Sequence, residues 1–315
     1  MTLVLTVTRS AWESHVATVA SRVSGLVPVV KGNGYGFGRD WLAQRAADLG
    51  THISVGTVDE VSSVPADRVP VVLTPVVESR PDLRSDTILT VGSPLHVAAS
   101  AGRPVLVKVR SSMNRYGCAP SEVAELAATA RRAGCSVVGL SIHPPLAGDT
   151  AEHVREIADI VRATDDSLND LPVWVSHIDG NGLDELRHLF DGREWFLRLG
   201  TSLWHGDKSM LRLEADVIDV HPVRRGDRAG YRLVPIEHDG LLVDIGCGTA
   251  HGVTPLDDGR SPFHFGRRRL ALLEPPHMHT SMAIITDDLA RPNVGDRVDV
   301  QRPLITTTVD RVDWV

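Results

Sequence analysis

Residues 26–38 read LVPVVKGNGYGFG, a run of five apolar residues followed by Lys31 and by a loop with glycine at every second position. A short, valine-rich run that is apolar throughout is typical of a strand covered on both faces in a parallel sheet. The next stretch, DWLAQRAADL (40–49), has the pattern of an amphipathic helix and ends before Gly50, a residue suited to the position after a helix. This part of the chain therefore predicts a strand, a glycine-rich loop and a helix in succession.

The same succession recurs along the first 200 residues. A second clear helix pattern, SEVAELAATARRA (121–133), ends before Gly134. Eight strand-like runs alternate with longer helix-like stretches, which favours an α/β fold with a closed (β/α)8 TIM barrel over an open sheet. The eight runs are 26–30, 53–56, 70–73, 87–91, 104–109, 136–142, 172–175 and 196–199.

After Gly200 the pattern changes. Short runs rich in Val, Leu and Ile are separated by turn sequences such as RRGD (224–227), which predicts a C-terminal all-β domain. We divide the chain into a barrel over 9–210 and a β domain over 211–315. Residues 3–8 alternate like an edge strand ahead of a helix at 10–22, and this pattern allows residues 1–8 to pair with the β domain. The β-domain runs are 215–220, 228–234, 241–245, 269–273, 281–285 and 297–300.

Composition excludes several classes of partner. The chain has 315 residues with 33 Lys+Arg against 40 Asp+Glu, and a net charge of −7 argues against a nucleic-acid partner. No apolar run approaches the ~20 residues of a membrane span, and the N-terminus lacks the pattern of a signal peptide. Three cysteines, too few and odd in number for a disulfide framework, indicate a reducing compartment. We therefore expect a cytoplasmic protein without a membrane partner.

Cationic residues gather at the predicted strand ends, where barrel enzymes carry their chemistry. The ends of the first, fifth, sixth and eighth runs carry Lys31, Lys108, His143 and Arg198, and Arg115 follows the fifth run. Such a cluster predicts an anionic ligand, and phosphate is the first candidate. The loops SHIDGNG (176–182) and LGTS (199–202), with Ser176, Asn181, Gly200 and Thr201, are rich in residues that bring backbone N–H groups close to a phosphate.

Lys31 has two interpretations. Burial at the end of a strand lowers the pKa of a lysine, which makes Lys31 a candidate for Schiff-base chemistry. The alternative is a surface lysine whose stem lies along apolar neighbours while its amine reaches water. Its place between LVPVV and a glycine-rich loop favours the first interpretation.

Several segments, in order along the chain, match the motifs of one known enzyme family. VVKGNGYGFG (29–38) has the spacing K-x-N-x-Y-G-x-G, and in this it resembles the cofactor-lysine motif of the alanine racemase family of fold-type III pyridoxal-phosphate (PLP) enzymes. KVRSSMNRYG (108–117) is similar to the family segment K-V-D-T-G-M-N-R-L-G, and LRLGTSLWHG (197–206) to V-R-P-G-I-x-L-Y-G. The closing RVDWV (311–315) is a weaker match to R-V-P-R-x-Y. The resemblance implies a barrel with a C-terminal β domain, pyridoxal 5'-phosphate as cofactor and a small amino acid as substrate.

The resemblance implies a role for each matching residue of the cofactor site. Lys31 would carry the cofactor as a Schiff base and move the α-proton on one face of the substrate. Tyr35 would contact the phosphate, and Arg115 would lie near the phenolic oxygen and the substrate carboxylate. Lys108 matches a position that is carbamylated in some relatives.

At the eighth strand the implied roles concern the ring and the phosphate. Arg198 would face the pyridine nitrogen, and Gly200 and Thr201 would give backbone donors to the phosphate. His143 matches the histidine that supports this arginine. Because a guanidinium stays protonated, it would leave the ring nitrogen neutral, which suits racemisation over transamination.

Each of these roles competes with a structural alternative. Arg198 could instead form an ion pair with Asp179 or Glu194. His143 could be a hydrogen-bonded core histidine. We expect His177 and His205 to be structural.

The match fails where the second base should be. A racemase needs a base on each face of the α-carbon, and the family uses a tyrosine of a G-Y-x-D-G segment from the other subunit. Here IGCGTAHGVTP (245–255) replaces it, with Thr249 or Cys247 in the tyrosine's place and His251 in that of the Asp. Cys247 as a thiolate, or His251, could act instead, while the alternative is a tight glycine-rich loop.

A second segment that comes from the partner subunit in the family also departs. PPHMHTSM (275–282) keeps Met278 but has His279 in place of an acid, and His279 is the third candidate base. With His251, the pair His277 and His279 would offer three imidazoles, as some metal sites do. We expect no metal and assign these histidines to the substrate carboxylate across a dimer interface. Arg110 and Trp314 also replace the family's residues.

Three functions follow from these observations. The first is a PLP-dependent amino-acid racemase of the alanine racemase type, acting as a head-to-tail homodimer. The second keeps the cofactor and changes the reaction to a dehydration, an aldol cleavage or racemisation of a bulkier substrate, which the histidine-rich β domain favours. The third is a PLP-binding protein without turnover, acting in cofactor homeostasis.

Overall fold

The computed structural model describes residues 3–286 and 291–315, and the chain forms two compact units. The barrel unit comprises Ser14–Gly34 and Arg39–Gly206, and the β unit comprises Met1–Glu13, Tyr35–Gly38 and Asp207–Val315. The two units are described separately below. In this structure no helix among the described residues is both long and apolar enough to cross a membrane.

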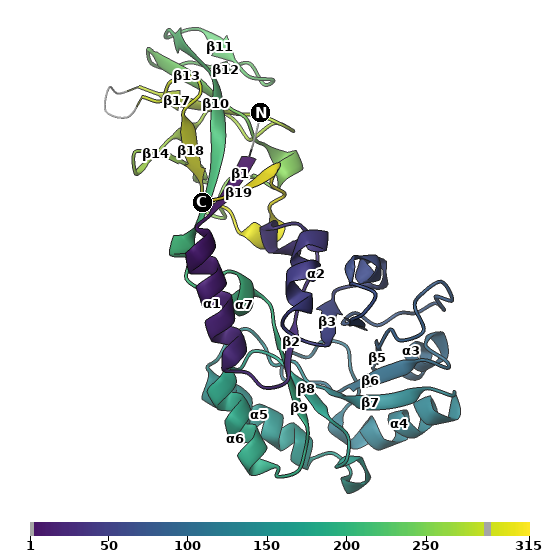
Figure 1. Ribbon diagram of the computed structural model, residues 1–315. Helices are drawn as coiled ribbons and strands as arrows, with labels where there is room; N and C mark the ends of the chain where they lie inside the picture. The colour runs from purple at the N-terminus through teal and green to yellow at the C-terminus, as the bar shows by residue number, and fades with distance from the viewer. Residues whose placement is uncertain (1–2, 287–290) are drawn as a thin grey trace. The chain divides into compact units, whose positions relative to one another are not determined.

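Eight parallel strands of the barrel unit form a closed ring (Figure 1). Six are hydrogen-bonded in the order β2-β9-β8-β7-β6-β5, and β3 pairs with β4. Single bridges, Val29 to Ser54 and Val71 to Ile88, join the pair to both ends of the six. The strands are β2 (Leu26–Pro28), β3 (His52–Val55), β4 (Val69–Val72), β5 (Leu89–Val91), β6 (Pro104–Lys108), β7 (Ser136–Ser141), β8 (Val173–Val175) and β9 (Trp195–Leu199). The predicted barrel is confirmed, and each of the eight apolar runs overlaps one strand.

The apolar runs become strands because both of their faces are covered. A cluster of Val27, Val71, Ile88, Leu106 and Trp174 fills part of the unit's core. Its members come mostly from alternate strands, as in the layered interior of a barrel. The core fixes the strands, and the strands fix the positions of the residues that follow them.

The helices of the chain include those that the patterns predicted at 10–22, 40–49 and 121–133. N-cap side chains fix the start of several helices. Asp149, for example, accepts the Glu152 N–H and completes a capping box before α5. The helices are α1 (Arg9–Ser21), α2 (Arg39–Ala47), α3 (Pro94–Ala99), α4 (Val123–Arg132), α5 (Thr150–Arg162), α6 (Gly180–Leu189) and α7 (Thr201–Trp204).

The β/α alternation is not regular, contrary to the sequence-based expectation. Between β3 and β4 the chain forms only a 3-10 helix, Val58–Ser63, and residues 73–88 between β4 and β5, all of them described, contain no α-helix. Prolines at 75 and 81 interrupt the second connection. Arg84 holds it instead, donating hydrogen bonds to the carbonyl oxygens of Val64, Pro65, Ala66 and Arg68.

The β unit contains a nine-stranded sheet around an apolar core. Its long strand β10 (Leu211–Val223) pairs with β13 (Gly240–Ile245) and β18 (Arg297–Val300), and β1 (Leu3–Val7) lies between β10 and β19 (Arg311–Trp314). Phe263, Val243 and Val298 are among the fully buried residues of this core. The remaining strands of the unit are β11 (Arg228–Ala229), β12 (Val234–Pro235), β14 (Phe263–Phe265), β15 (Arg268–Arg269), β16 (Ala271–Leu272) and β17 (Ser281–Ile285).

Two predicted β-domain strands are wrong in detail. The run 228–234 is not one strand. Residues 230–233 form a turn between β11 and β12, because Gly230 and Leu233 have positive φ values of 78° and 49° that a strand does not allow. The run 269–273 is divided between β15 and β16. Leu270, between them, hydrogen-bonds to the Phe263 carbonyl.

The observed division of the chain also differs from the predicted one. The β unit begins at Asp207 and takes in the first turns of α1 and the segment Tyr35–Gly38, which the sequence-based division gave to the barrel. Aromatic packing explains the difference, since Trp314 of β19 packs against Trp12 at 5.3 Å and Phe37 at 6.1 Å between ring centroids. Gly36 lies beside Leu304, whose Cβ would come within 3.2 Å of a side chain there.

Candidate active site

Polar residues follow the carboxyl ends of the barrel strands. Lys31 comes three residues after β2, Lys108 is the last residue of β6, and His143 comes two residues after β7. Ser176 directly follows β8, and Arg198 lies in β9. Since parallel strands end at the same edge of a barrel, these side chains share one mouth.

Arg198 is buried and held by hydrogen bonds from its whole guanidinium group. Nη1 donates to Ser141 Oγ at 2.9 Å, and Nη2 donates to the carbonyl oxygens of Ile142 at 2.8 Å and Trp174 at 3.2 Å. Nε donates to the Val175 carbonyl at 3.4 Å. Burial lowers the pKa of Arg198 to about 10, so the group still carries its charge at neutral pH.

The structural alternatives for Arg198 and His143 can now be compared. Within the described residues Arg198 forms no ion pair, so the alternative pairing with Asp179 or Glu194 is wrong. The prediction that His143 supports Arg198 is also wrong, because His143 Nδ1 lies 2.9 Å from Ser176 Oγ and the arginine is held by Ser141 and main-chain carbonyls.

His143 is a neutral imidazole in this structure. Burial, with the charges of Arg198 and Lys108, holds its pKa far below the usual range. Its ring packs against the His177 ring at 4.5 Å between centroids. It therefore acts as an uncharged hydrogen-bonding group at the barrel mouth.

Lys108 is a buried amine whose Nζ has no hydrogen-bond partner among the described residues. Burial and the charges of Arg198 and Arg115 lower its pKa well below the usual value. A buried polar atom without a partner costs free energy, so this position favours a neutral amine or a nearby anion.

Lys31 is exposed as a whole, yet enough protein surrounds its amine for desolvation to lower its pKa. The charges of Arg115 and Arg198 lower the pKa further, and the carboxylate of Glu60 opposes them. The sequence analysis missed Glu60. The signal was present in TVDE (57–60), a capping-box pattern directly after a predicted strand.

The loop that carries Arg115 is anchored beside Lys108. A small pocket is lined by Lys108, Ser111, Met113, Arg115, Tyr116 and His143. The Arg115 guanidinium lies 4.8 Å from the Tyr116 ring centroid, and Tyr116 Oη donates to the Leu73 carbonyl at 2.9 Å. Ser111 Oγ donates to the His143 carbonyl at 2.7 Å.

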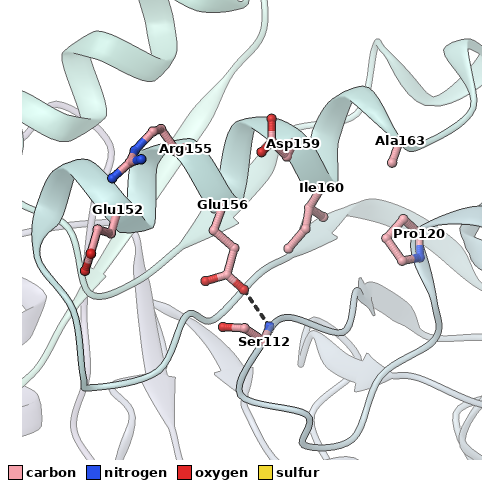
Figure 2. A pocket seen from close by; sticks show the side chains of 8 residues that line it. All are labelled: Ser112, Pro120, Glu152, Arg155, Glu156, Asp159, Ile160 and Ala163. Atoms are coloured by element: carbon pink, nitrogen blue, oxygen red, sulfur yellow. Dashed lines mark hydrogen bonds between the residues drawn. The ribbon is translucent and has the colours of Figure 1, made fainter.

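A second anchor of this loop comes from α5 (Figure 2). Glu156 accepts the Ser112 N–H at 2.5 Å, inside a groove that Arg155, Asp159 and Ile160 also line. Figure 2 shows the Glu156 carboxylate pointing from the helix to the loop. No sequence pattern predicts this contact, because the two residues lie 44 positions apart.

The other predicted cofactor residues are less clearly placed. Thr201 is exposed at the start of α7, directly after Gly200, and Asn181 is exposed in the first turn of α6. Tyr35 belongs to the β unit and is buried, with a φ of 57° that is uncommon for a non-glycine residue. Their roles stay predictions.

Cys247 is no longer a candidate base. It lies in the core of the β unit with no exposed surface, and burial raises the pKa of its thiol far above neutrality. A thiol that is protonated and inaccessible to solvent cannot exchange a proton with a substrate. The prediction for Cys247 is therefore wrong for a physical reason that spacing does not reveal.

The three β-unit histidines singled out from the sequence, His251, His277 and His279, differ in their partners. Nδ1 of His251 accepts the Gly248 N–H at 3.1 Å, and its Nε2 lies 3.3 Å from Asp310 Oδ2, so both ring nitrogens are engaged. His277 Nε2 lies 2.5 Å from the buried Glu274 carboxylate. His279 is exposed, and its ring meets the His251 ring edge-on at 6.0 Å.

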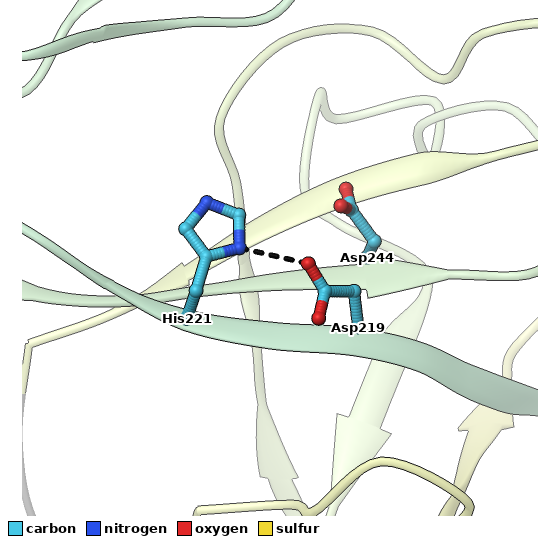
Figure 3. Close-up of side chains that lie close together, drawn as sticks. All are labelled: Asp219, His221 and Asp244. Carbon is cyan, nitrogen blue, oxygen red and sulfur yellow. Dashed lines mark hydrogen bonds and ion pairs between the residues drawn. The ribbon is translucent and has the colours of Figure 1, made fainter.

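Within the described residues, His251, His277 and His279 do not bring three ligand atoms close together. Among residues 3–286 and 291–315, the group with metal-ligating atoms close together is Asp219, His221 and Asp244 (Figure 3). Asp219 and Asp244 face each other across β10 and β13, and His221 Nδ1 lies 2.9 Å from Asp219 Oδ2. We interpret this exposed group as an ion pair on the sheet surface.

The mouth of this parallel barrel holds Lys31, whose pKa is lowered, and Arg198, which is bound to main-chain carbonyl oxygens. These features are those of a barrel enzyme with a cationic site. The family model "Alanine racemase, N-terminal domain" matches residues 7–203, well over half of the chain. The chain belongs to this family.

Curated relatives agree with this assignment. An alanine racemase of Laribacter hongkongensis is 26% identical over 313 residues, covering 90% of this chain and 84% of the relative. An alanine racemase of Cereibacter sphaeroides is also 26% identical, over 66% of this chain and 58% of the relative.

Solved structures share the fold. A crystal structure of alanine racemase from Bartonella henselae with covalently bound pyridoxal phosphate has a TM-score of 0.75 at 17% identity, with both chains covered completely. Alanine racemase from E. faecalis has a TM-score of 0.72 at 18% identity, over 99% of this chain and 98% of the other. At these identities the likeness shows the fold: a TIM barrel with a C-terminal β domain.

Proposed function

We propose that this protein is a PLP-dependent amino-acid racemase of the alanine racemase type, with Lys31 as the residue that binds the cofactor covalently. The observation that carries the proposal is the Lys31 amine, whose pKa is lowered at a barrel mouth that also holds Arg115 and the buried Arg198. A lowered pKa leaves more of the amine in the neutral, nucleophilic form that condenses with an aldehyde.

The residues present suit an anionic aldehyde cofactor. The charges of Arg115 and Arg198 disfavour the charged form of both Lys31 and Lys108, and Lys108 Nζ lacks a hydrogen-bond partner among the described residues. A phosphate-bearing ligand would relieve this excess of positive charge. PLP, when bound, withdraws electrons from the α-carbon of an attached amino acid and so makes its α-proton mobile.

The proposed cofactor contacts follow the matching residues. Arg198 would face the pyridine nitrogen. The carbonyl oxygens of Ile142 and Trp174 hold its guanidinium, which keeps its proton and so can act only as a hydrogen-bond donor. The phosphate would lie among Ser176 and Asn181, polar residues of the loop after β8, and Gly200 and Thr201, to which the family resemblance assigns backbone donors. His143 stays neutral beside Ser176 and adds no further charge.

Lys31 moves the α-proton on one face of the substrate. Arg115 orients the substrate carboxylate, since a guanidinium on an exposed loop can bind it through two parallel hydrogen bonds. A racemase needs a second base on the opposite face.

We assign the second base to His279, supplied by the other subunit of a head-to-tail homodimer. The contacts of the other candidates support it: Cys247 is buried, both nitrogens of His251 are engaged, and His277 binds Glu274. The His279 side chain, by contrast, is exposed.

All three cysteines are buried and form no disulfide, which supports a reducing, cytoplasmic setting.

His279→Gln is expected to lower the racemisation rate of L- and D-alanine by ~10²–10⁴-fold, the range of a lost general base. Proton exchange at the face served by Lys31 should continue, so one enantiomer should still take up deuterium from D2O. Coupled enzymatic assays and NMR of the recovered substrate measure the two effects.

His277→Gln is the matched control, because this neighbour is bound to Glu274 and should affect stability more than exchange. Wild-type racemisation in His279→Gln, with its loss in His251→Gln, would contradict the assignment of His279. Deuterium uptake by one enantiomer alone in the wild-type protein would instead support the second function, a one-sided PLP reaction. A protein that binds PLP and exchanges no α-proton would support the third function, a PLP-binding protein without turnover.

Cys247→Ala is expected to leave kcat for racemisation unchanged and to lower the free energy of unfolding by about 1–2 kcal/mol, because a small buried group is deleted from a packed core. Urea unfolding and the coupled assay, run on the same preparation, measure both. A large loss of kcat with unchanged stability would contradict this and would make Cys247 a candidate base again.

A further inference from the structure

One carboxylate joins the two loops on either side of Lys31. The chain turns directly after Lys31, where Gly32 has a φ of 60°. Glu60 Oε1 accepts the Gly32 N–H at 2.8 Å, and Glu60 Oε2 accepts the Gly56 N–H at 2.6 Å. The peptide that follows Lys31 on the loop after β2 is therefore tied to the loop after β3 by a single side chain.

Arg39 completes the arrangement from the start of α2. Its Nη1 donates to the Gly32 carbonyl at 3.0 Å and lies 3.7 Å from Glu60 Oε1, and its Nε donates to Ser63 Oγ at 2.9 Å. Both polar groups of the Gly32 main chain are thus bound by charged side chains, and hydrogen bonds to charged groups are the stronger kind. The side chain of Glu60 is 12% exposed, so these bonds are partly shielded from water.

Gly56 leaves room for both Glu60 and Lys31. A Cβ atom added at Gly56 would lie 3.0 Å from Glu60 Oε2 and 3.3 Å from Lys31 Cβ, so a side chain there would crowd both of them. Among the charges that act on the Lys31 amine, Arg115 and Arg198 lower its pKa and Glu60 raises it.

We propose that Glu60 is a positioning residue for the reaction: its carboxylate fixes the peptide that carries Lys31 and supplies the negative charge that this lysine faces. Glu60 acts through Lys31 and touches no reacting atom. The inference rests on the proposed function of Lys31, and nothing in the family resemblance pointed to this residue.

The test is Glu60→Gln in the PLP-loaded protein. An amide has one acceptor oxygen, so the variant keeps one N–H contact and turns a donor toward the other. We expect the dissociation constant for PLP to rise by about tenfold or more, as for the loss of a charged hydrogen bond. We expect kcat for alanine to fall by a similar factor with KM unchanged.

The pH dependence gives a readout that loss of structure alone would not move. An anion stabilises the cationic form of the Lys31 nitrogen, so its removal lets that nitrogen lose its proton at lower pH. The midpoint of the cofactor's absorbance change with pH should therefore move downward in Glu60→Gln.

Asp59→Asn is the matched control. Asp59 lies in the same 3-10 helix but is exposed and pairs with Arg80 at 2.9 Å, so its loss should leave PLP affinity, the midpoint and kcat unchanged. Gly56→Ala crowds Glu60 Oε2 and Lys31 Cβ while leaving the Glu60 charge in place. It should weaken PLP binding and lower kcat, and it decides the matter if Glu60→Gln does not fold.

Wild-type PLP affinity, midpoint and kcat in Glu60→Gln, or in Gly56→Ala if only that variant folds, would overturn the role of Glu60. Failure of the wild-type protein to take up PLP would overturn the proposed function instead, so the two failures are distinguishable.

Discussion

Replacing Lys31 by alanine is expected to abolish covalent attachment of PLP and to lower racemisation by at least ~10³-fold, because the variant loses both the attachment point and one of the two bases. The overall fold should survive, since Lys31 is exposed and lies in a loop rather than in the core. Absorbance spectroscopy of the purified variant after PLP addition, followed by the coupled alanine assay, measures both losses.

Lys208→Ala is a clean control for this experiment. The chain has only three lysines, Lys31, Lys108 and Lys208, and Lys208 is an exposed residue of the β unit. It should retain the wild-type spectrum and activity. Wild-type spectrum and activity in Lys31→Ala would contradict the assignment of Lys31.

Replacing Arg198 by leucine is expected to affect both stability and activity. The substitution leaves Ser141 Oγ and the Ile142 carbonyl without their donor, whereas the Trp174 carbonyl keeps the Ile142 N–H at 2.9 Å. At ~1–3 kcal/mol for each buried acceptor, less the relief of a buried charge, the free energy of unfolding should fall by about 2–4 kcal/mol. Loss of a pre-positioned donor at the cofactor ring should lower kcat by ~10²-fold or more.

Arg193→Leu separates these two effects. Arg193 also donates to main-chain carbonyls, those of Leu171 at 3.0 Å and Leu168 at 2.9 Å, but it lies ahead of β9, away from the strand ends. The Arg193→Leu variant should be less stable than the wild-type protein, and its folded molecules should have the wild-type kcat. Chemical unfolding and the assay under folding conditions compare the two variants, and equal retention of kcat in both would contradict the role of Arg198.

The barrel strands could be predicted from the sequence, because a strand that is covered on both faces is apolar throughout and can be recognised as an apolar run. The eight runs predicted from 26–30 to 196–199 each overlap a strand, and the residues at their ends lie at one mouth. The sequence was insufficient for the connections: a helix was expected between β4 and β5, where Arg84 and main-chain carbonyls hold an irregular loop instead.

The site divides in the same way. Residue type and position at a strand end pointed to Lys31, Lys108 and Arg198, because the chemistry of an amine or guanidinium at a strand end is a local property. The partners of those groups depend on contacts between distant segments, so Ser141 as the partner of Arg198 and the depth of Cys247 were not predictable. Glu60 was predictable in part, as the fourth residue of a capping box, although its contact with Gly32 was not.

The central claim is a covalent bond between PLP and one lysine. The protein is incubated with PLP, reduced with borohydride, digested and mapped by mass spectrometry, with the three lysines resolved on separate peptides. The account predicts one stable pyridoxyl adduct per chain, on Lys31. An adduct on Lys108 or Lys208, or none at all, would contradict it.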